Sequence, residues 1–186
     1  MKGRILPSED PSVLGPIAAY LDLPIVDHGD CVIEVRGVMG ANMAFRASVF
    51  KRVGLFDERL GPGAAGHEEE TEMSARLRLA GFRIGYAPRA LVYHEVNAMR
   101  ADRSRFIRIA RERGYCRTLH EVHSPAEVAF KIAIASTRLA IARALRATPE
   151  RIAREERRLA VAQGMRDGLR SQRGYRDDSN SSSRTP

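Results

Sequence analysis

Hydrophobic and polar residues follow two different patterns along the chain, and the change falls near residue 100. Before it, short apolar runs are separated by Gly and Pro, and after it the apolar residues recur at helical spacing. The pattern predicts an α/β fold over residues 1–100, followed by an α-helical extension over residues 101–169. Residues 170–186 contain almost nothing apolar, so we expect a disordered tail there.

The α/β part is expected to begin with two short elements. Residues 13–23 are apolar enough for a short helix. Residues 32–45 are rich in β-branched side chains and predict a buried strand that bends at Gly37 and Gly40.

Two helices and two extended segments should follow. Residues 47–53 have helical spacing and predict a helix that ends at Gly54. The acidic run 67–72 opens a helix that we expect to end at Gly81, where a left-handed cap belongs. Residues 82–87 and 90–94 predict two short extended segments.

The extension carries clear signals for helix ends. Residues 102–113 predict a helix that stops at Gly114. Ser124, followed by Pro125 and by a glutamate at the third helical position, is typical of an N-cap, and Thr148 precedes a further Pro-initiated helix.

Basic charge is concentrated in the extension. Residues 1–100 hold 12 basic and 13 acidic side chains, whereas residues 101–186 hold 19 and 10. Since only three of the basic residues are lysine, the arginines reflect a codon preference as much as phosphate contacts. Without zinc-finger spacing or aromatic-rich RNA-binding strands, the sequence weighs against nucleic-acid binding.

Cysteine content and hydropathy indicate the compartment. Cys31 and Cys116 are too few for a disulfide framework, and no apolar run reaches the ~18 residues of a spanning helix. We expect a cytoplasmic protein, with peripheral contact at the inner face of the membrane as one option.

Residues 40–94 contain the most specific motifs of the chain. They are GANMAF from Gly40, VGLFDE from Val53, EEETEM with its helix, and VYH ending at His94. This order of motifs resembles the C-terminal half of family 2 glycosyltransferases, which are inverting enzymes of the GT-A fold. The resemblance implies a nucleotide-sugar donor and a sugar or lipid-linked acceptor.

The resemblance places the catalytic base in the acidic run. An inverting transfer needs one carboxylate that takes the proton of the acceptor hydroxyl. The motif aligns Glu69 with the family's glutamate and Glu70 with its catalytic aspartate, so this chain carries the longer side chain at the base position. Alternatively, these carboxylates only interact with the exposed amides of a helix N-terminus.

Four further residues take candidate roles from the resemblance. His94 matches a metal ligand near the diphosphate, where the complete enzyme would use a divalent cation, Mn or Mg. Gly40, Ala41 and Asn42 match positions that line the substrate cleft. The alternatives are a histidine bonded to backbone and a strand bend that glycine suits equally well.

The family's nucleotide-binding half has no counterpart upstream of Gly40. No Asp-x-Asp motif lies there, and the pair Asp27 and Asp30 has the wrong spacing. We therefore expect a partial GT-A domain that lacks its N-terminal nucleotide-binding half. A truncated gene start, a partner chain that supplies this half, and a remnant without catalysis all remain open.

A second class of function rests on the helices of residues 124–169. A basic amphipathic helix can lie on an anionic membrane surface. The alternative to glycosyl transfer is thus a non-enzymatic interaction protein or a membrane-surface-associated protein, although the same pattern also suits helices that pack on each other.

Overall fold

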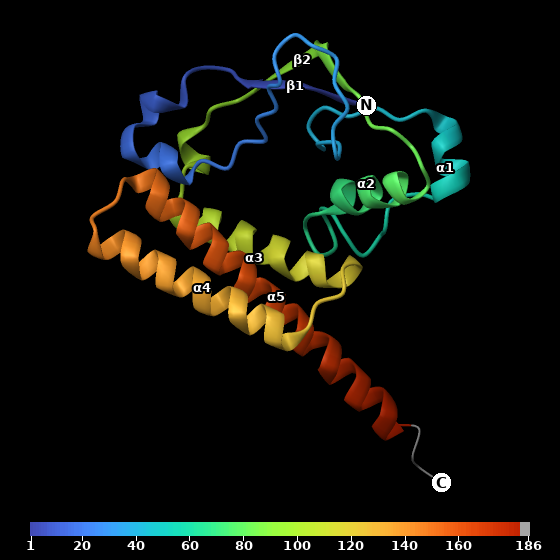
Figure 1. Ribbon diagram of the computed structural model, residues 1–186, viewed down its shortest axis with the longest axis vertical. Helices are drawn as coiled ribbons and strands as arrows, with labels where there is room; N and C mark the ends of the chain where they lie inside the picture. The colour runs from blue at the N-terminus through green and yellow to red at the C-terminus, as the bar shows by residue number, and fades with distance from the viewer. Residues whose placement is uncertain (183–186) are drawn as a thin grey trace. The chain divides into compact units, whose positions relative to one another are not determined.

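A computed structural model describes residues 1–182 of the chain, with side chains for residues 1–172. The chain divides into two compact units, coloured blue to green and yellow to red in Figure 1. Unit 1 comprises residues 1–64 and 68–101, and unit 2 comprises residues 65–67 with the chain from Asp102 onward. Strands and helices are both present, so the mixed α/β class is confirmed.

Unit 1 contains a two-stranded parallel sheet. β1 (Lys2–Pro7) pairs with β2 (Tyr86–His94), and the register skips three residues of β2 after Gly3. Pro88 lies in the skipped part, where its missing amide hydrogen costs no ladder bond. One irregular strand therefore replaces the two predicted segments.

The prediction of a strand over residues 32–45 was wrong. This segment makes only isolated bridges, to Lys2 and to Gly85. It then turns, and the amide of Asn42 donates to the carbonyl of Met39 at 3.0 Å. The turn interrupts the extended backbone that a continuous ladder requires.

The helices of unit 1 end at the predicted glycines. α1 (Ala47–Val53) is followed by Gly54 with φ 77°, and α2 (Glu69–Leu79) ends before Gly81 with φ 81°. Both values lie in the left-handed region, which glycine enters without a Cβ penalty.

The flanking 3₁₀ helices of unit 1 are short or broken. η1 (Pro11–Tyr20) replaces the helix predicted over residues 13–23, and Gly15 interrupts it with φ 60°. η2 (Ala98–Arg100) lies at the end of the unit.

Two apolar clusters fill unit 1. Ile5 of β1 and Tyr86 of β2 pack with Val26. The larger cluster joins the irregular segment to α1 and α2 and comprises Val38, Val49, Met73, Leu77 and Ile84. Apolar contact, rather than an extensive sheet, therefore holds the unit together.

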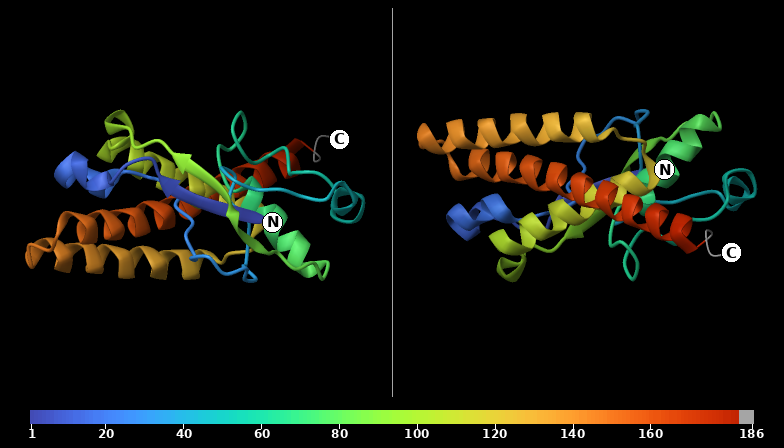
Figure 2. Two further views of the ribbon diagram at one scale, coloured as in Figure 1. Left: turned by 90° about the horizontal axis from the view of Figure 1, so that it is seen from above. Right: turned by 90° about the horizontal axis from the view of Figure 1, so that it is seen from below.

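The regular elements of unit 2 in the described part of the chain are helices joined by short connections. It consists of α3 (Arg103–His120), α4 (Pro125–Ala144) and α5 (Pro149–Ser182). α4 and α5 lie side by side and antiparallel, and α3 runs parallel to α5 (Figure 2). As predicted, the Ser124 hydroxyl caps α4, accepting from the amide of Glu127 at 3.1 Å.

α3 does not stop at Gly114 as predicted. A Cβ on Gly114 would lie 2.0 Å from the carbonyl oxygen of Val161, and one on Gly164 would lie 1.9 Å from that of Arg111. Because the backbones of α3 and α5 approach this closely, these glycines serve helix packing, and Gly114 does not end its helix.

α5 continues past residue 169, into the segment for which composition predicted disorder. Its contacts with α3 reach Gln172. A Cβ on Gly168 would meet the Thr118 side chain, and Gln172 Nε2 donates to the Thr118 carbonyl at 2.6 Å. Residues 183–186, the end of that predicted tail, lie outside the described residues.

One buried carboxylate joins all three helices of unit 2. Glu156 of α5 accepts from Nη2 of Arg103 on α3 at 2.8 Å and from Nη2 of Arg143 on α4 at 2.7 Å. Burial raises the pKa of the Glu156 carboxyl, but the hydrogen bonds from the two guanidinium groups more than offset this, so its pKa lies below the ordinary 4.5.

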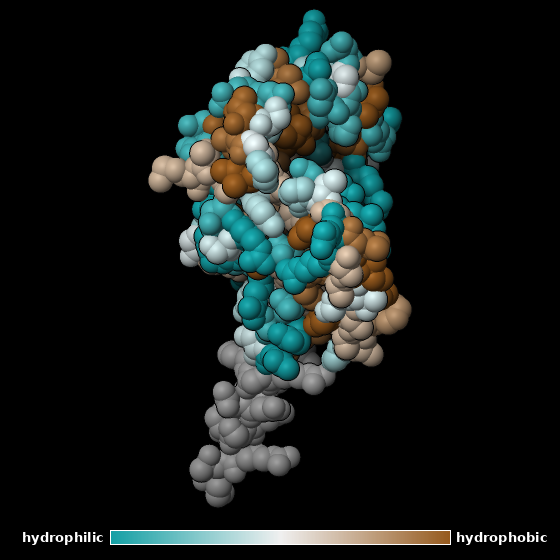
Figure 3. All heavy atoms as spheres, turned by 90° about the vertical axis from the view of Figure 1, so that its left-hand side faces the viewer, coloured by the Kyte–Doolittle hydropathy of each residue, from teal (hydrophilic) through white to brown (hydrophobic). Residues whose placement is uncertain are grey.

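Large apolar side chains also reach the surface. In η1, Val13 and Ile17 are exposed, and Figure 3 shows a face on which hydrophobic side chains lie among hydrophilic ones. Over residues 1–182, no helix combines the length and the apolarity needed to cross a bilayer.

Replacing Gly114 by Ala should destabilise unit 2. The substitution raises helix propensity by about 1 kcal/mol, but the methyl group would overlap a rigid carbonyl, and overpacking costs about 1–3 kcal/mol or more. We expect a lower midpoint of urea denaturation. Gly168→Ala should cost less, since the Thr118 side chain that it meets can rotate. Equal stability of Gly114→Ala and the wild type would contradict the close packing.

Replacing Glu156 by Gln should destabilise unit 2 in a pH-dependent way. Because the folded pKa is lowered, the stabilisation by this carboxylate is complete above its unfolded pKa and is lost as the pH falls through the folded value. Urea denaturation should show a loss of about 1–3 kcal/mol at pH 7 that shrinks below pH ~4. Glu112→Gln, which removes partly exposed pairs with Arg108 and His67, should cost less than Glu156→Gln. If Glu156→Gln lowers the free energy of unfolding equally at neutral and at acidic pH, this role of the carboxylate is ruled out.

Candidate functional site

The candidate base lies in the first turn of α2. The loop before this helix turns through Gly61 and Gly63, both with positive φ, and Glu68 at the N-cap has φ 76°. Glu68 is buried, with 8% exposure, although its backbone is in a region that non-glycine residues rarely adopt. This backbone brings Glu69 and Glu70 to the helix start.

Glu69 faces the glycine loop. A Cβ on Gly61 would lie 3.2 Å from the carboxyl carbon of Glu69, so the absence of a side chain at Gly61 makes room for this carboxylate. The Glu69 carboxylate thus lies against the loop at Gly61.

Glu70 faces the turn at Gly40. A Cβ on Gly40 would lie 3.8 Å from Glu70 Oε1, although the two residues are 30 positions apart. The Glu70 side chain is half-buried and Gly40 is exposed. The structure thus brings together one predicted catalytic residue and one predicted substrate-lining residue at an accessible place.

Ser74 holds the Gly40 segment against α2. Its hydroxyl donates to the Glu70 carbonyl at 2.6 Å and accepts from the amide of Val38 at 3.1 Å. Ser74 is buried, and a Cβ on Gly37 would lie 3.1 Å from its Oγ. The sequence reasoning missed this positioning residue. Its only signal is a serine one turn after Glu70, beside the apolar positions of the helix.

The third carboxylate in the first turn of α2 pairs with an arginine. Glu72 accepts from Nε of Arg76 at 2.6 Å, and Arg76 also donates to the carbonyls of Val53 and Leu55. Since Arg76 thereby ties the end of α1 to α2, Glu72 supports the fold.

Asn42 faces the two strands. Its Nδ2 donates to the Arg4 carbonyl of β1 at 3.0 Å and to the Ala90 carbonyl of β2 at 2.7 Å. Both amide hydrogens are therefore engaged where the register skips. Ala41, next to it, is exposed in the turn.

His94 ends β2 opposite Pro7 of β1. Its Nδ1 lies 3.3 Å from the carbonyl oxygen of Glu95, and its own carbonyl accepts from the amide of Ser8 at 2.8 Å. The described residues contain no group of three or more His, Cys, Asp or Glu side chains that could hold a metal ion. Because none of the residues that the structure describes completes a ligand set for Mn or Mg around His94, we derive no chemical step through a divalent cation.

A cavity of about 660 Å³ lies elsewhere in unit 1. It is lined by Phe45, Leu77 and Phe82 among others, but not by Glu70 or His94. The candidate site combines the half-buried Glu70 with the exposed turn at Gly40.

No family model, no curated protein and no solved structure matches the chain. The resemblance to family 2 glycosyltransferases accordingly rests on the motifs of residues 40–94. What the site can do chemically follows from its own geometry.

Replacing Asn42 by Ala should lower the stability of unit 1. Two partly buried carbonyls would lose their donor, at a cost of about 1–3 kcal/mol. Urea denaturation followed by circular dichroism measures this loss. Asn97→Ala, which removes only a cap to the amide of Met99 in an exposed turn, should cost less. Unchanged stability of Asn42→Ala would leave this amide free to serve a ligand.

Proposed function

We propose that unit 1 supplies the acceptor half of a glycosyltransferase site of the family 2 type, with Glu70 as the general base. The observation that carries the proposal is the juxtaposition of Glu70 and Gly40, since the resemblance gives these two segments adjoining roles. The GT-A architecture and the inverting reaction are part of the proposal.

Glu70 would accept the proton of an acceptor hydroxyl. As the proton moves to the carboxylate, the acceptor oxygen forms a bond to the anomeric carbon of the donor sugar. The bond from that carbon to the diphosphate oxygen breaks on the opposite side, and its electron pair leaves with the nucleoside diphosphate. The product has inverted configuration, and Glu70 carries the proton.

The surroundings of Glu70 suit an incoming acceptor. Gly40 presents no side chain toward the carboxylate, so a hydroxyl can approach it from the exposed turn. Ser74 fixes the backbone on both sides of the pair. Such fixed geometry matters because small displacements of a base lower the rate steeply.

The remaining parts of the reaction belong to groups outside these residues. The proposal includes a nucleotide-sugar donor, a sugar or lipid-linked acceptor, and a nucleotide-binding half supplied either by a longer form of this chain or by a separate polypeptide. The divalent cation that the resemblance implies would take its ligands from that other half, since the described residues offer no ligand set at His94.

Replacing Glu70 by Gln should abolish sugar transfer without unfolding the protein. The assay uses extract of source cells that lack the gene, supplemented with the purified chain and a panel of labelled nucleotide sugars with Mn²⁺. We expect the wild type to restore transfer to an acceptor and Glu70→Gln to lower it by ~100-fold or more. Glu70→Asp, which restores the family's residue, should retain activity.

Glu9→Gln is the matched control for this experiment. Glu9 is an exposed carboxylate of the same unit and lies outside the motifs of residues 40–94, so its loss should leave transfer unchanged. Retained transfer by folded Glu70→Gln would remove Glu70 from the mechanism. Absence of transfer from every nucleotide sugar by the wild type would refute the proposed function.

A second candidate is a non-enzymatic interaction protein that acts through unit 2. It is favoured by α4, which buries Val128, Ala135 and Leu139 on one side and leaves Phe130 and Leu145 exposed on another. A helix that is apolar on two faces has one face available to a partner.

A further inference from the structure

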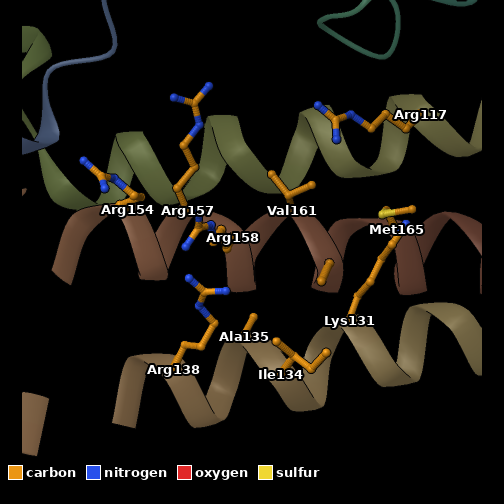
Figure 4. A pocket seen from close by; sticks show the side chains of 11 residues that line it. Arg117, Lys131, Ile134, Ala135, Arg138, Arg154, Arg157, Arg158, Val161 and Met165 are labelled. Carbon is orange, nitrogen blue, oxygen red and sulfur yellow. The ribbon is translucent and has the colours of Figure 1, made fainter. Parts of the chain in front are cut away.

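A groove in unit 2 gathers cationic side chains from three helices (Figure 4). It has a volume of about 430 Å³, which is within the range of small-ligand sites. We call it the basic groove and define it by its six cations, Arg117, Lys131, Arg138, Arg154, Arg157 and Arg158. α3 contributes the first, α4 the next two and α5 the last three.

Two carboxylates of α4 and α5 pair with cations of the groove. Glu155 pairs with Nη1 of Arg158 at 2.6 Å and with Nε of Arg138 at 3.3 Å, and Glu127 pairs with Lys131 at 2.5 Å. None of the lining residues in the described part of the chain is itself acidic, so the lining is basic in character.

The rest of the groove is hydrocarbon. Ile134 of α4 faces Val161 and Met165 of α5, with alanines between them. Figure 4 shows these side chains between the cationic ones. The lining side chains thus offer hydrogen-bond donors and apolar carbon, but no amide or carboxylate to accept from a ligand.

An exposed apolar stripe continues from the groove along α4. Phe130 is 65% exposed and Leu145 69% exposed, with Ile134 and Ile141 between them at 42% and 48%. Their spacing, i, i+4, i+11 and i+15, places them on one face of the helix. Ile134 belongs to both the stripe and the groove, so the apolar and cationic surfaces are continuous.

This combination selects the chemistry of the partner. A surface of donors beside hydrocarbon is matched by anionic oxygens attached to hydrocarbon, as in a phospholipid. A nucleic acid would instead leave the stripe facing water and would find no aromatic side chain in the groove for its bases.

We propose that the basic groove binds phosphate headgroups of an anionic bilayer, into whose surface the stripe of Phe130, Ile134, Ile141 and Leu145 inserts. The inference rests on the second candidate function and concerns unit 2 alone. It does not depend on sugar transfer by unit 1.

Co-sedimentation of the full chain with vesicles tests the proposal. One set contains phosphatidylcholine with 30% phosphatidylglycerol, and the other contains phosphatidylcholine alone. We expect at least tenfold stronger binding to the anionic vesicles, weakened by 0.5 M salt because surface attraction is screened. Equal binding to both sets, or none, would overturn the proposal.

Two pairs of substitutions separate the parts of the surface. Arg154→Gln with Arg157→Gln removes two groove cations, and Phe130→Ser with Leu145→Ser polarises the stripe. Each pair should weaken binding about tenfold. The control, Arg105→Gln with Arg151→Gln, removes the same charge from exposed positions outside the groove and should weaken it less than threefold. Circular dichroism confirms that each variant is folded.

Other partners would give different results. If groove and control pairs weaken binding equally, general charge attracts the protein and the groove has no special role. If duplex DNA competes with the vesicles at equal phosphate concentration and its binding requires the groove but not the stripe, the partner is a nucleic acid. Either outcome refutes headgroup binding by the basic groove but leaves both the interaction class and the sugar-transfer assay unaffected.

Discussion

The side-chain amide of Asn42 donates to carbonyls of β1 and β2, and the candidate site in unit 1 depends on these two bonds. They fill the skip in the sheet register, and Gly3 carries no side chain because a Cβ there would lie 2.1 Å from Asn42 Nδ2. The turn at Gly40, two residues earlier, is thereby anchored to the strands. Ser74 anchors the same turn to α2 from the other side, so Gly40 and Glu70 are held together from two directions.

Elements whose signals are local could be predicted from the sequence. The caps at Ser124, Gly54 and Gly81 depend only on residues within a turn of each helix end, and the structure has all three. The strand over residues 32–45 failed because a strand needs distant partners, and its glycines instead form a turn. The prediction of a helix end at Gly114 failed for a related reason. A glycine that ends a helix and one that allows a second helix to approach closely look alike in sequence.

The candidate site could be predicted only in part. The resemblance gave Glu70 and Gly40 adjoining roles, and the Glu70 carboxylate lies beside the backbone of Gly40. The role of Ser74 could not be predicted, because it depends on the Val38 amide lying within hydrogen-bond distance of its hydroxyl. The groove in unit 2 was also beyond reach: the excess of arginine was visible, but arginines such as Arg103 and Arg143 serve an internal carboxylate, whereas Arg154 lines a groove. Only the packing of the helices separates these two uses.

The parallel arrangement of α3 and α5 has a consequence for how unit 2 assembles. α4 and α5 are joined by a short turn and can pair soon after both are synthesised, whereas Gly114 meets Val161 across 47 positions of the chain. Contacts of such long range form late, because the intervening chain must first be ordered. On a ribosome, α3 emerges well before the partner helix that Gly114 contacts. We expect the C-terminal hairpin to act as the template on which α3 finally docks, which makes the last part of the unit to be made the first to become ordered.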